Sequence, residues 1–270
     1  MNKFKLGVAQ LTSIDDVRAN LTHIERLYLE AVRKDADLAV FPENSLYLRI
    51  RSAGAIEGLN LAGAEAAQLD KLVAKHGTPL MLTTPVAATG GKAHNSTVLF
   101  QRGLPARVLY SKIHLFDVDV AGAPPVRESD GFHRGVEPAV VEIDGWKFGL
   151  SICYDLRFSE LFVRYAQKVD AILIPSAFLV PTGEAHWHVL VRARAIECQC
   201  FVAAPAQSGE HVSVQGGSGR STFGHSLVVD PWGKIITELT RGPEMHVTEL
   251  NRELIEKTRR QIPMSGHRRL

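Results

Sequence analysis

The sequence contains little cysteine and no long apolar run. Only three of its 270 residues are cysteines, Cys153, Cys198 and Cys200, which is too few for a disulfide framework. We therefore expect a cytoplasmic protein, since a single thiol stays reduced in a reducing compartment. No stretch of 18 apolar residues could span a membrane, and the N-terminal segment MNKFKLGVAQL lacks the apolar core of a signal peptide.

The sequence also lacks an excess of charge of one sign. Its 31 Lys and Arg residues nearly balance 29 Asp and Glu residues, which leaves a formal charge of +2. Without a run of like charges, no nucleic-acid-binding face and no membrane-binding patch is expected. Glycine and proline are not concentrated in a linker or a low-complexity segment. A chain of this length and ordinary composition fits one α/β domain, 1–270.

Short apolar runs alternate with helical patterns along the chain. Apolar spacing predicts helices at 17–33, 64–76, 159–167, 185–198 and 252–260. Strands are predicted at 5–10, 38–41, 80–84, 96–100, 107–111, 139–143, 147–152, 171–174, 201–204, 225–229, 234–238 and 245–250. Asp144-Gly145 predicts a hairpin turn, and 113–138 predicts a long irregular stretch. Strands interleaved with helices indicate a layered α/β sandwich.

Several predicted strands end on a chemically active or polar residue. LAVFPENS supplies Glu43, VLYSKIHL supplies Lys112, FGLSICYD supplies Cys153, and AILIPSAF ends at Pro175-Ser176. Taken alone, each residue has an ordinary structural explanation: a buried cysteine, a helix-start or surface carboxylate, or a solvated lysine. If the strand ends meet, the site contains one thiol, one carboxylate and one ammonium.

These three groups are sufficient for acyl transfer through a thioester. A nearby cation lowers the pKa of a cysteine and favours the thiolate. A glutamate can take the thiol proton and return it to a leaving amine. A lysine can stabilise the oxyanion of a tetrahedral intermediate, an effect of roughly 3–4 kcal/mol for one donor. Sequence spacing alone does not prove that the three side chains meet.

The motifs around these residues resemble those of the nitrilase superfamily of carbon–nitrogen hydrolases. The matching segments are FPEN, YSKIHLFD, RESD, ICYDLRFSEL, PSAFLVPTGEAHWHVLVRARAIECQCFVAA and GHSLVVDPWG, which cover essentially the whole chain in order. The resemblance implies a four-layer α-β-β-α sandwich with one site per subunit. It also implies that subunits pair into an eight-layer stack, as a homodimer or a higher homo-oligomer, and that neither a cofactor nor a metal is needed.

The resemblance also assigns roles to individual residues. Cys153 is implied as the nucleophile, Glu43 as the general base and later acid, and Lys112 as the stabiliser of the oxyanion. Glu128 matches a second glutamate that orients the substrate and the lysine, and the backbone N–H of Tyr154 would be the second oxyanion donor. A sharp turn from strand to helix would project the thiol into a cleft.

Residues that bind substrate are less clearly marked. We expect Tyr47 and Phe178 to form pocket walls, with simple packing as the alternative. Asp155 and Arg157 are expected mainly to fix the turn and the helix start, although Arg157 could instead contact the substrate. The cation that would bind an acidic substrate stays open among Arg49, Arg51, Arg157, Arg268 and Arg269.

Three further patterns were weighed as ligand sites. His186-Trp187-His188 and Cys198-Gln199-Cys200 contain metal-ligating residue types, but a spacing of two places neighbours on different faces of a helix. No metal site is therefore predicted, and the two cysteines are expected to pack in the core or at a helix end. The segment 216–219, GGSG, lacks the Lys-Ser/Thr ending of a phosphate-binding loop and predicts a flexible loop.

Within the superfamily, the chain is most similar to the branch of deaminated glutathione amidase and ω-amidase. KIHLFDVDVAG resembles ω-amidase, whereas PSAF, HW-VL-RARAIE-QC and AAPAQSG resemble deaminated glutathione amidase. We expect an amidase that cleaves the terminal C–N bond of a small 2-oxo-acid amide through a cysteine thioester and releases ammonia. Deaminated glutathione amidase is the preferred assignment. The alternatives are an ω-amidase acting on 2-oxoglutaramate and a hydrolase of another small amide or a carbamoyl compound.

Other kinds of protein fit the residues less well. Nitrilase activity is less expected because the chain lacks a C-terminal extension, and a fusion glutaminase would need a synthetase domain. A non-catalytic binding or scaffold protein on the same fold would not need all three catalytic residue types. A papain-like protease would need a histidine beside Cys153, for which His114 and His186 are available.

Replacing Lys112 separates a Glu–Lys–Cys hydrolase from a Cys–His enzyme. We expect Lys112→Ala to lose nearly all turnover of a 2-oxo-acid amide, because the oxyanion loses its charged donor. Initial rates of the purified variant, with circular dichroism to confirm folding, measure this effect. A folded variant with normal turnover would support the Cys–His enzyme instead.

Overall fold

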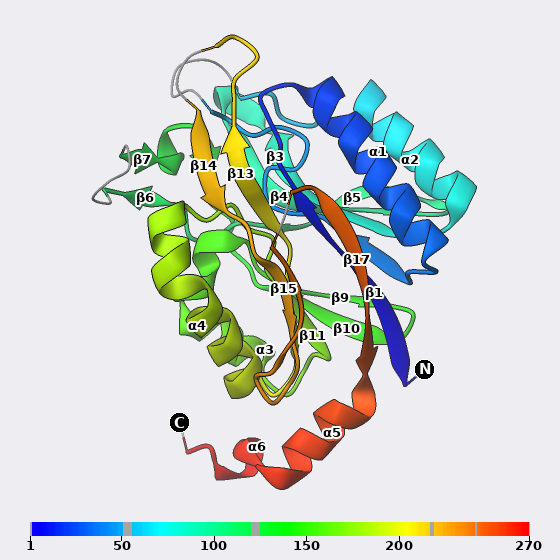
Figure 1. Cartoon of the computed structure of the whole chain (residues 1–270), viewed down its shortest axis with the longest axis vertical. Helices are drawn as coiled ribbons and strands as arrows, with labels where there is room; N and C mark the ends of the chain where they lie inside the picture. Colours follow the sequence, from blue (N-terminus) through cyan, green and yellow to red (C-terminus); the bar gives the residue numbers. More distant parts are fainter. Residues whose placement is uncertain (1, 51–55, 120–124, 217–218, 241, 270) are drawn as a thin grey trace.

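The computed structural model of the chain describes residues 2–50, 56–119, 125–216, 219–240 and 242–269. Arg51 and part of the segment 216–219, both considered above, lie outside these residues. Within the described residues, two large β-sheets pack against each other and helices cover their outer faces (Figure 1).

The larger sheet has nine strands among the described residues. Seven of them follow the order β14 (Arg220–Phe223), β13 (Ala206–His211), β1 (Lys3–Leu11), β2 (Leu38–Val40), β3 (Leu80–Ala87), β4 (Ala93–Gln101) and β5 (Leu104–Ser111). In addition, β17 (Glu244–Asn251) pairs with β1, and β8 (Phe132–His133) pairs with β4.

The smaller sheet has six strands in the described part of the chain. Their order is β16 (Ile235–Leu239), β15 (Ser226–Val229), β12 (Phe201–Ala204), β11 (Ala171–Leu173), β10 (Trp146–Leu150) and β9 (Ala139–Ile143). A separate short ribbon consists of β6 (Asp117–Val118) and β7 (Val126–Arg127).

Helices form the two outer layers. Helices α1 (Val17–Arg33) and α2 (Ala64–His76) pack on the larger sheet, whereas α3 (Ser159–Tyr165) and α4 (Val180–Cys198) pack on the smaller one (Figure 1). Helices α5 (Arg252–Gln261) and α6 (Met264–His267) follow the last strand. Three short 3-10 turns are η1 (Thr89–Gly91), η2 (Glu128–Asp130) and η3 (Cys153–Arg157). None of the described helices is long and apolar enough to cross a membrane.

Strand β1 shows why the larger sheet lies between two cores. Side chains alternate between the faces of a strand. Phe4, Leu6 and Val8 therefore pack in the core between the sheets, whereas Ala9 and Leu11 pack in the core beneath α1 and α2. From Leu6 onward both faces of the strand are buried, whereas Lys3 and Lys5 are exposed at its start. The predicted four-layer α-β-β-α sandwich is confirmed.

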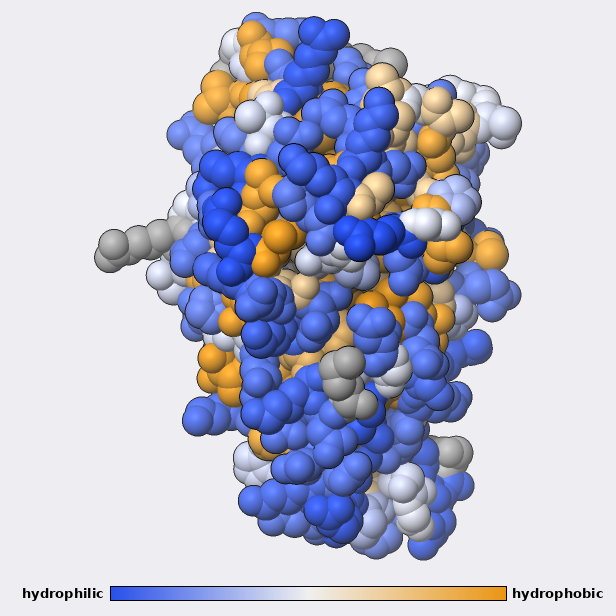
Figure 2. All heavy atoms as spheres, turned by 90° about the vertical axis from the view of Figure 1, so that its right-hand side faces the viewer, coloured by the Kyte–Doolittle hydropathy of each residue, from blue (hydrophilic) through white to orange (hydrophobic). Residues whose placement is uncertain are grey.

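Helix α1 has the bounds that its sequence pattern predicts. The Asp16 side chain accepts hydrogen bonds from the backbone N–H groups of Arg18 and Ala19 and so caps the helix. One face, at helical spacing, is buried: Leu21, Ile24, Leu27, Tyr28 and Ala31. Hydrophilic side chains cover most of the molecular face on this side, with small apolar areas between them (Figure 2).

Three regions of the described chain differ most from the sequence prediction. The stretch 113–138 was predicted to be irregular, but it contains β6, β7, η2 and β8. Strands β13 and β14 were not predicted, because AQSGEH and RSTF show no apolar alternation. Helix α4 begins at Val180 rather than 185, and Pro181 is tolerated there because the first helical turn needs no N–H donor.

The packing of Tyr165 on Gly149 can be tested by adding one methyl group. Gly149 lies in β10, close before the predicted nucleophile, and a Cβ there would lie 2.8 Å from the Tyr165 ring. The Tyr165 hydroxyl donates to the Leu150 carbonyl (2.6 Å), so the ring has little freedom to move. We expect Gly149→Ala to lower the free energy of unfolding by about 1–3 kcal/mol in urea titrations.

Gly266→Ala is the matched control. An added Cβ at Gly266 meets no atom within 4 Å. Equal unfolding midpoints for the two variants would contradict the close packing of Tyr165 on Gly149.

Candidate active site

The structure brings together the four side chains that the sequence predicted as catalytic. Glu43 follows β2, Lys112 follows β5, Cys153 follows β10, and Glu128 begins η2. Lys112 Nζ lies 2.7 Å from Glu43 Oε1 and 2.8 Å from Glu128 Oε2. The Glu43 carboxylate and the Lys112 ammonium both act on the pKa of the Cys153 thiol, so the thiol lies beside this pair. One ammonium therefore bridges two carboxylates beside the thiol.

This cluster is almost completely shielded from solvent. Only 2% of Glu43, 2% of Lys112 and 7% of Cys153 is exposed. Charges in such a place are stable only when each is paired and hydrogen-bonded. The two carboxylates and the lysine satisfy this condition for one another.

A sharp turn presents Cys153 to the site, as expected. Its φ of 48° is left-handed, which is uncommon for a residue other than glycine. Its N–H donates to the Pro175 carbonyl (3.0 Å), which ties the turn to the strand β11 side of the sheet. Backbone strain of this kind is found most often at functional sites.

Asp155 fixes this turn to the segment that carries the lysine. Its Oδ2 accepts hydrogen bonds from the Ile152 N–H (2.9 Å) and the Tyr110 hydroxyl (2.7 Å). Its Oδ1 accepts one from the His114 N–H (3.0 Å), and His114 Nδ1 lies 2.7 Å from the same oxygen. Asp155 is fully buried, and it thereby holds the nucleophile turn and the loop after Lys112 in one relative position.

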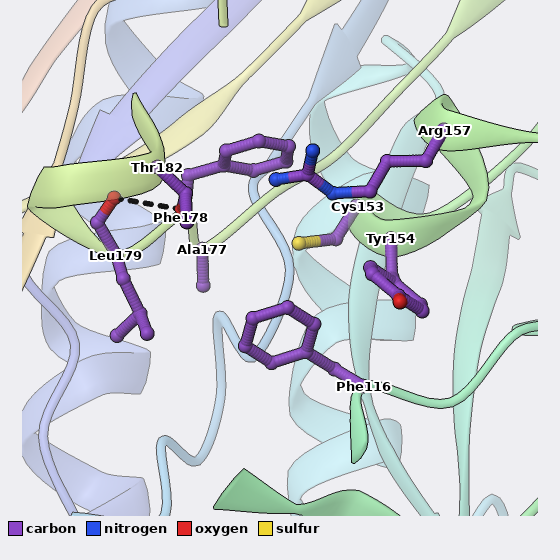
Figure 3. A pocket seen from close by; sticks show the side chains of 8 residues that line it. All are labelled: Phe116, Cys153, Tyr154, Arg157, Ala177, Phe178, Leu179 and Thr182. Atoms are coloured by element: carbon purple, nitrogen blue, oxygen red, sulfur yellow. Dashed lines mark hydrogen bonds between the residues drawn. The ribbon is translucent and has the colours of Figure 1, made fainter. Parts of the chain in front are cut away.

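The thiol opens onto a small pocket. Its empty space is about 210 Å³. Figure 3 shows the sulfur of Cys153 pointing into the space between Phe116 and Phe178. The lining residues are Phe116, Cys153, Tyr154, Arg157, Ala177, Phe178, Leu179 and Thr182. Tyr154 is the second residue of the turn η3, and N–H groups in the first turn of a helix have no partner within the helix. This position is compatible with its predicted role as an oxyanion donor.

Several arginines were candidates for binding an acidic substrate. Among those that the structure describes, Arg157 lines this pocket. Its guanidinium lies 5.3 Å from the Phe178 ring and 5.9 Å from the Tyr154 ring. Its Nη1 is 3.2 Å from His186 Nδ1. The guanidinium therefore places a positive charge in the pocket of Cys153, in addition to any effect on the turn.

The other predicted binding residues lie elsewhere. Tyr47 is largely buried and is absent from the residues that line the pocket, so its substrate contact stays a prediction. Arg49 is also absent from that lining. Arg268 and Arg269 are exposed after α6, and Arg269 bonds to the carbonyl of Gly266.

Known proteins with similar sequences show which family this arrangement represents. A family model described as carbon-nitrogen hydrolase matches residues 5–260. The chain belongs to the carbon–nitrogen hydrolase family.

Two curated relatives and one solved structure illustrate the similarity. The hydrolase is 36% identical over 279 residues to deaminated glutathione amidase of Synechocystis sp., with 99% of each chain covered. It is 30% identical over 278 residues to chloroplastic omega-amidase of Arabidopsis thaliana, covering 100% of this chain and 73% of that one. Nit3 of Saccharomyces cerevisiae, a member of branch 10 of the nitrilase superfamily, matches with a TM-score of 0.82 and 30% identity, covering 100% of this chain and 97% of Nit3.

The thiol of the hydrolase rests in its protonated form. Burial raises the pKa of Cys153 well above its usual value, and the charge of Glu43 raises it further. Lys112 lowers the same pKa, but by less than these two effects together. Lys112 therefore acts on the Cys153 pKa in the direction expected from the sequence, although burial and Glu43 determine the net direction. If Cys153 is the nucleophile, as the sequence predicts, its proton leaves during attack, and Glu43 is the carboxylate beside it.

The lysine, by contrast, stays charged. Burial alone would lower the pKa of Lys112, but the charges of Glu128 and Glu43 outweigh burial and hold the pKa well above its usual value. A permanent positive charge therefore lies next to the predicted nucleophile at neutral pH.

Asn95 belongs to the same cluster and was missed in the sequence. It lies in β4, and its Nδ2 is 2.8 Å from Glu43 Oε1 and 3.2 Å from Glu128 Oε1. The predicted strand began one residue later, so Asn95 was treated as part of a loop. A polar run within this strand is the signal in the sequence that could have identified it. The run consists of Asn95, Ser96 and Thr97, and the structure buries all three.

Among the described residues, one group of side chains could hold a metal ion, and it lies outside the pocket. His188 Nε2 and His225 Nδ1 lie 2.9 Å and 2.6 Å from the same oxygen, Oε1 of Glu238. His186 faces Arg157 instead, so the expectation that His186 and His188 point in different directions is confirmed. In each histidine, the nitrogen that faces this group is already hydrogen-bonded to the carboxylate. We therefore interpret the group as a hydrogen-bonded link between α4 and the β15–β16 hairpin.

Removing the charge of Glu43 should have two opposite effects. The Cys153 thiol should become more reactive, but the group that would accept its proton during amide hydrolysis is lost. We expect Glu43→Gln to lower the pKa of Cys153, because the carboxylate that raises it is gone, so that iodoacetamide labels the cysteine faster at pH 8. Amide hydrolysis should fall at the same time, because no base accepts the thiol proton. Rates of labelling followed by mass spectrometry between pH 6 and pH 10 measure the shift.

Cys198 and Cys200 are fully buried, so we expect little labelling of either. The Cys153→Ala variant is the control, because any iodoacetamide that it takes up has reacted at one of these two cysteines. Slower labelling of Glu43→Gln than of the unchanged protein would contradict the electrostatic role of Glu43.

Proposed function

We propose that this hydrolase is an amidase that cleaves the terminal C–N bond of a small 2-oxo-acid amide through a thioester on Cys153. The observation that carries the proposal is the buried bridge of Lys112 between Glu43 and Glu128, beside a thiol that opens onto a pocket. The curated names of the relatives support an amide as the substrate class.

The first half of the reaction forms the thioester. Glu43 takes the proton of Cys153 as the sulfur attacks the amide carbon. The negative charge that develops on the amide oxygen is stabilised by the ammonium of Lys112 and the backbone N–H of Tyr154. Glu43 then gives its proton to the amide nitrogen, the C–N bond breaks, and the amine leaves.

The second half hydrolyses the thioester. A water molecule loses a proton to Glu43 and attacks the thioester carbon through the same oxyanion site. The C–S bond breaks, the acid product forms, and the proton on Glu43 returns to the sulfur. Glu128 is bonded to Lys112 throughout, and its Oε2 also accepts the Phe116 N–H (2.6 Å), so it orients the lysine and the pocket residue Phe116 together.

Arg157 supplies the charge that an acidic substrate needs. A 2-oxo acid carries a carboxylate, and a guanidinium binds a carboxylate through paired N–H donors. The cation lies in the same pocket as the nucleophile, so we propose that it binds the carboxylate at the far end of the acyl group.

Deaminated glutathione is the preferred substrate, and 2-oxoglutaramate is the second candidate. Both have the same 2-oxoglutaryl acyl group. Ammonia leaves from 2-oxoglutaramate, whereas cysteinylglycine leaves from deaminated glutathione, so the release of ammonia expected from the sequence applies only to the second candidate. The pocket that Cys153 lines is small, and we propose that it holds the shared acyl group. One of the curated relatives is an omega-amidase, and this similarity is the observation that keeps 2-oxoglutaramate as a candidate.

We further propose that residues 1–270 act as one domain and that the protein pairs as a cytoplasmic homodimer or larger assembly in an eight-layer stack. Exposed apolar side chains on the outer α3/α4 layer support pairing through that layer. They are Val163, Val189 and Ile196. A face of this kind is typical of protein–protein contacts.

The substrate is tested by measuring 2-oxoglutarate, the product common to both candidates. We expect a higher kcat/KM with deaminated glutathione than with 2-oxoglutaramate, and no product with Cys153→Ala. A preference for 2-oxoglutaramate would identify an ω-amidase. Failure on both, with a thiol that iodoacetamide still labels, would contradict a 2-oxo-acid substrate and direct the search to carbamoyl amides.

Arg157→Gln provides the second arm of this experiment. Loss of a hydrogen bond to a charged group should raise KM about tenfold or more for both substrates. Arg164→Gln, on the neighbouring helix α3 and outside the pocket lining, is the matched control. An unchanged KM in Arg157→Gln would exclude this arginine as the carboxylate-binding group.

A further inference from the structure

Asn95 occupies the centre of the charged cluster and contacts three of its members. Its backbone carbonyl accepts the Lys112 N–H (2.8 Å), and its Nδ2 donates to Glu43 and Glu128. Only 1% of the residue is exposed. Asn95 thus joins the lysine through the backbone and both glutamates through one side-chain amide group.

The other half of this amide group has no hydrogen-bond partner in the part of the chain that the structure describes. Asn95 Oδ1 is buried without a hydrogen bond among the described residues, and a buried acceptor without a donor lowers stability. The opposite orientation would place Oδ1 against the carboxylate oxygens, where like partial charges repel. The orientation of Asn95 is therefore set by Glu43 and Glu128, at a cost to its own hydrogen bonding.

Charge balance explains what the amide contributes. Glu43 and Glu128 share the single positive charge of Lys112, so the cluster carries one negative charge in excess when both are ionised. Two carboxylates in one buried site repel, and this favours protonation of one of them. An amide NH₂ has two N–H donors, and the two recorded contacts distribute them over both carboxylates without adding a charge.

We propose that Asn95 is a positioning residue that keeps both glutamates ionised and fixed on Lys112. Glu43 is then free to act as the base while Glu128 orients the lysine. This inference rests on the proposed amidase function and adds a fifth member to its machinery. The charged or titratable groups that face Asn95 are Lys112 after β5, Glu43 after β2 and Glu128 in η2, with the Cys153 thiol beyond Glu43.

Two substitutions change the donor in different ways. Asn95→Ala removes both N–H donors without adding a charge, and Asn95→Asp keeps the shape but replaces the donors with a third carboxylate. We expect the acidic limb of the pH profile of kcat/KM to move to higher pH in Asn95→Ala and further in Asn95→Asp. At pH 7, kcat should fall about tenfold or more, with KM changed less than kcat, because Asn95 is absent from the pocket lining.

Asn20 offers a matched control for a buried asparagine. It is 2% exposed and donates through Nδ2 to the carbonyls of Ile14 and Leu46. Asn20→Ala should lower stability but leave the pH profile of kcat/KM unchanged. An Asn95→Ala variant that loses activity with an unmoved acidic limb would overturn the proposal and leave Asn95 with a purely structural role.

Labelling of Cys153 separates this proposal from the proposed function. We expect iodoacetamide labelling of Asn95→Asp to begin at higher pH than in the unchanged protein, because an added negative charge near Glu43 disfavours the thiolate. Asn95→Ala should shift labelling less. Equal labelling profiles for the Asp and Ala variants would overturn the proposed place of Asn95 beside the charged cluster. If labelling shifts as expected in the two Asn95 variants but the unchanged protein hydrolyses no amide, the result contradicts the proposed amidase function and not the place of Asn95.

Discussion

The ammonium of Lys112, buried between two carboxylates, is the interaction on which the site depends. A lone charge in this environment would be expelled or neutralised, because burial removes its water. Glu43 and Glu128 keep the lysine charged, and the lysine in turn allows two carboxylates to share one buried space. The three residues therefore form one electrostatic unit, and the proton of Cys153 is held by the balance of charges within it.

The two-sheet scaffold positions this unit. Glu43 and Lys112 come from the ends of strands in the larger sheet, and Cys153 follows a strand of the smaller one, so the site lies where the two sheets meet. Asp155 crosses this junction by bonding Tyr110 of β5 and the nucleophile turn. A fixed distance between base and nucleophile follows from the packing of two rigid layers, rather than from a flexible loop.

Sequence reasoning predicted much of this arrangement, and the exceptions have physical causes. The bounds of α1 and α2 follow from local spacing, since capping and an apolar face are local properties. The meeting of Glu43 with Lys112, 69 residues apart, does not follow from spacing, and only the resemblance of motifs predicted it. Asn95 was missed because it has no motif of its own and acts through contacts that only the folded chain creates. The state of the thiol was also beyond sequence, because it depends on burial and on competing charges.

The protonated resting state of Cys153 has a consequence for the lifetime of the protein. Peroxides oxidise thiolates far faster than thiols, and oxidation beyond the sulfenic acid is usually irreversible. A thiol that is 7% exposed and whose pKa is raised by burial is poorly placed to meet an oxidant. In the proposed reaction, the thiolate forms only as the bound substrate is attacked. The burial that would make Cys153 depend on Glu43 as a base should therefore also slow its oxidation.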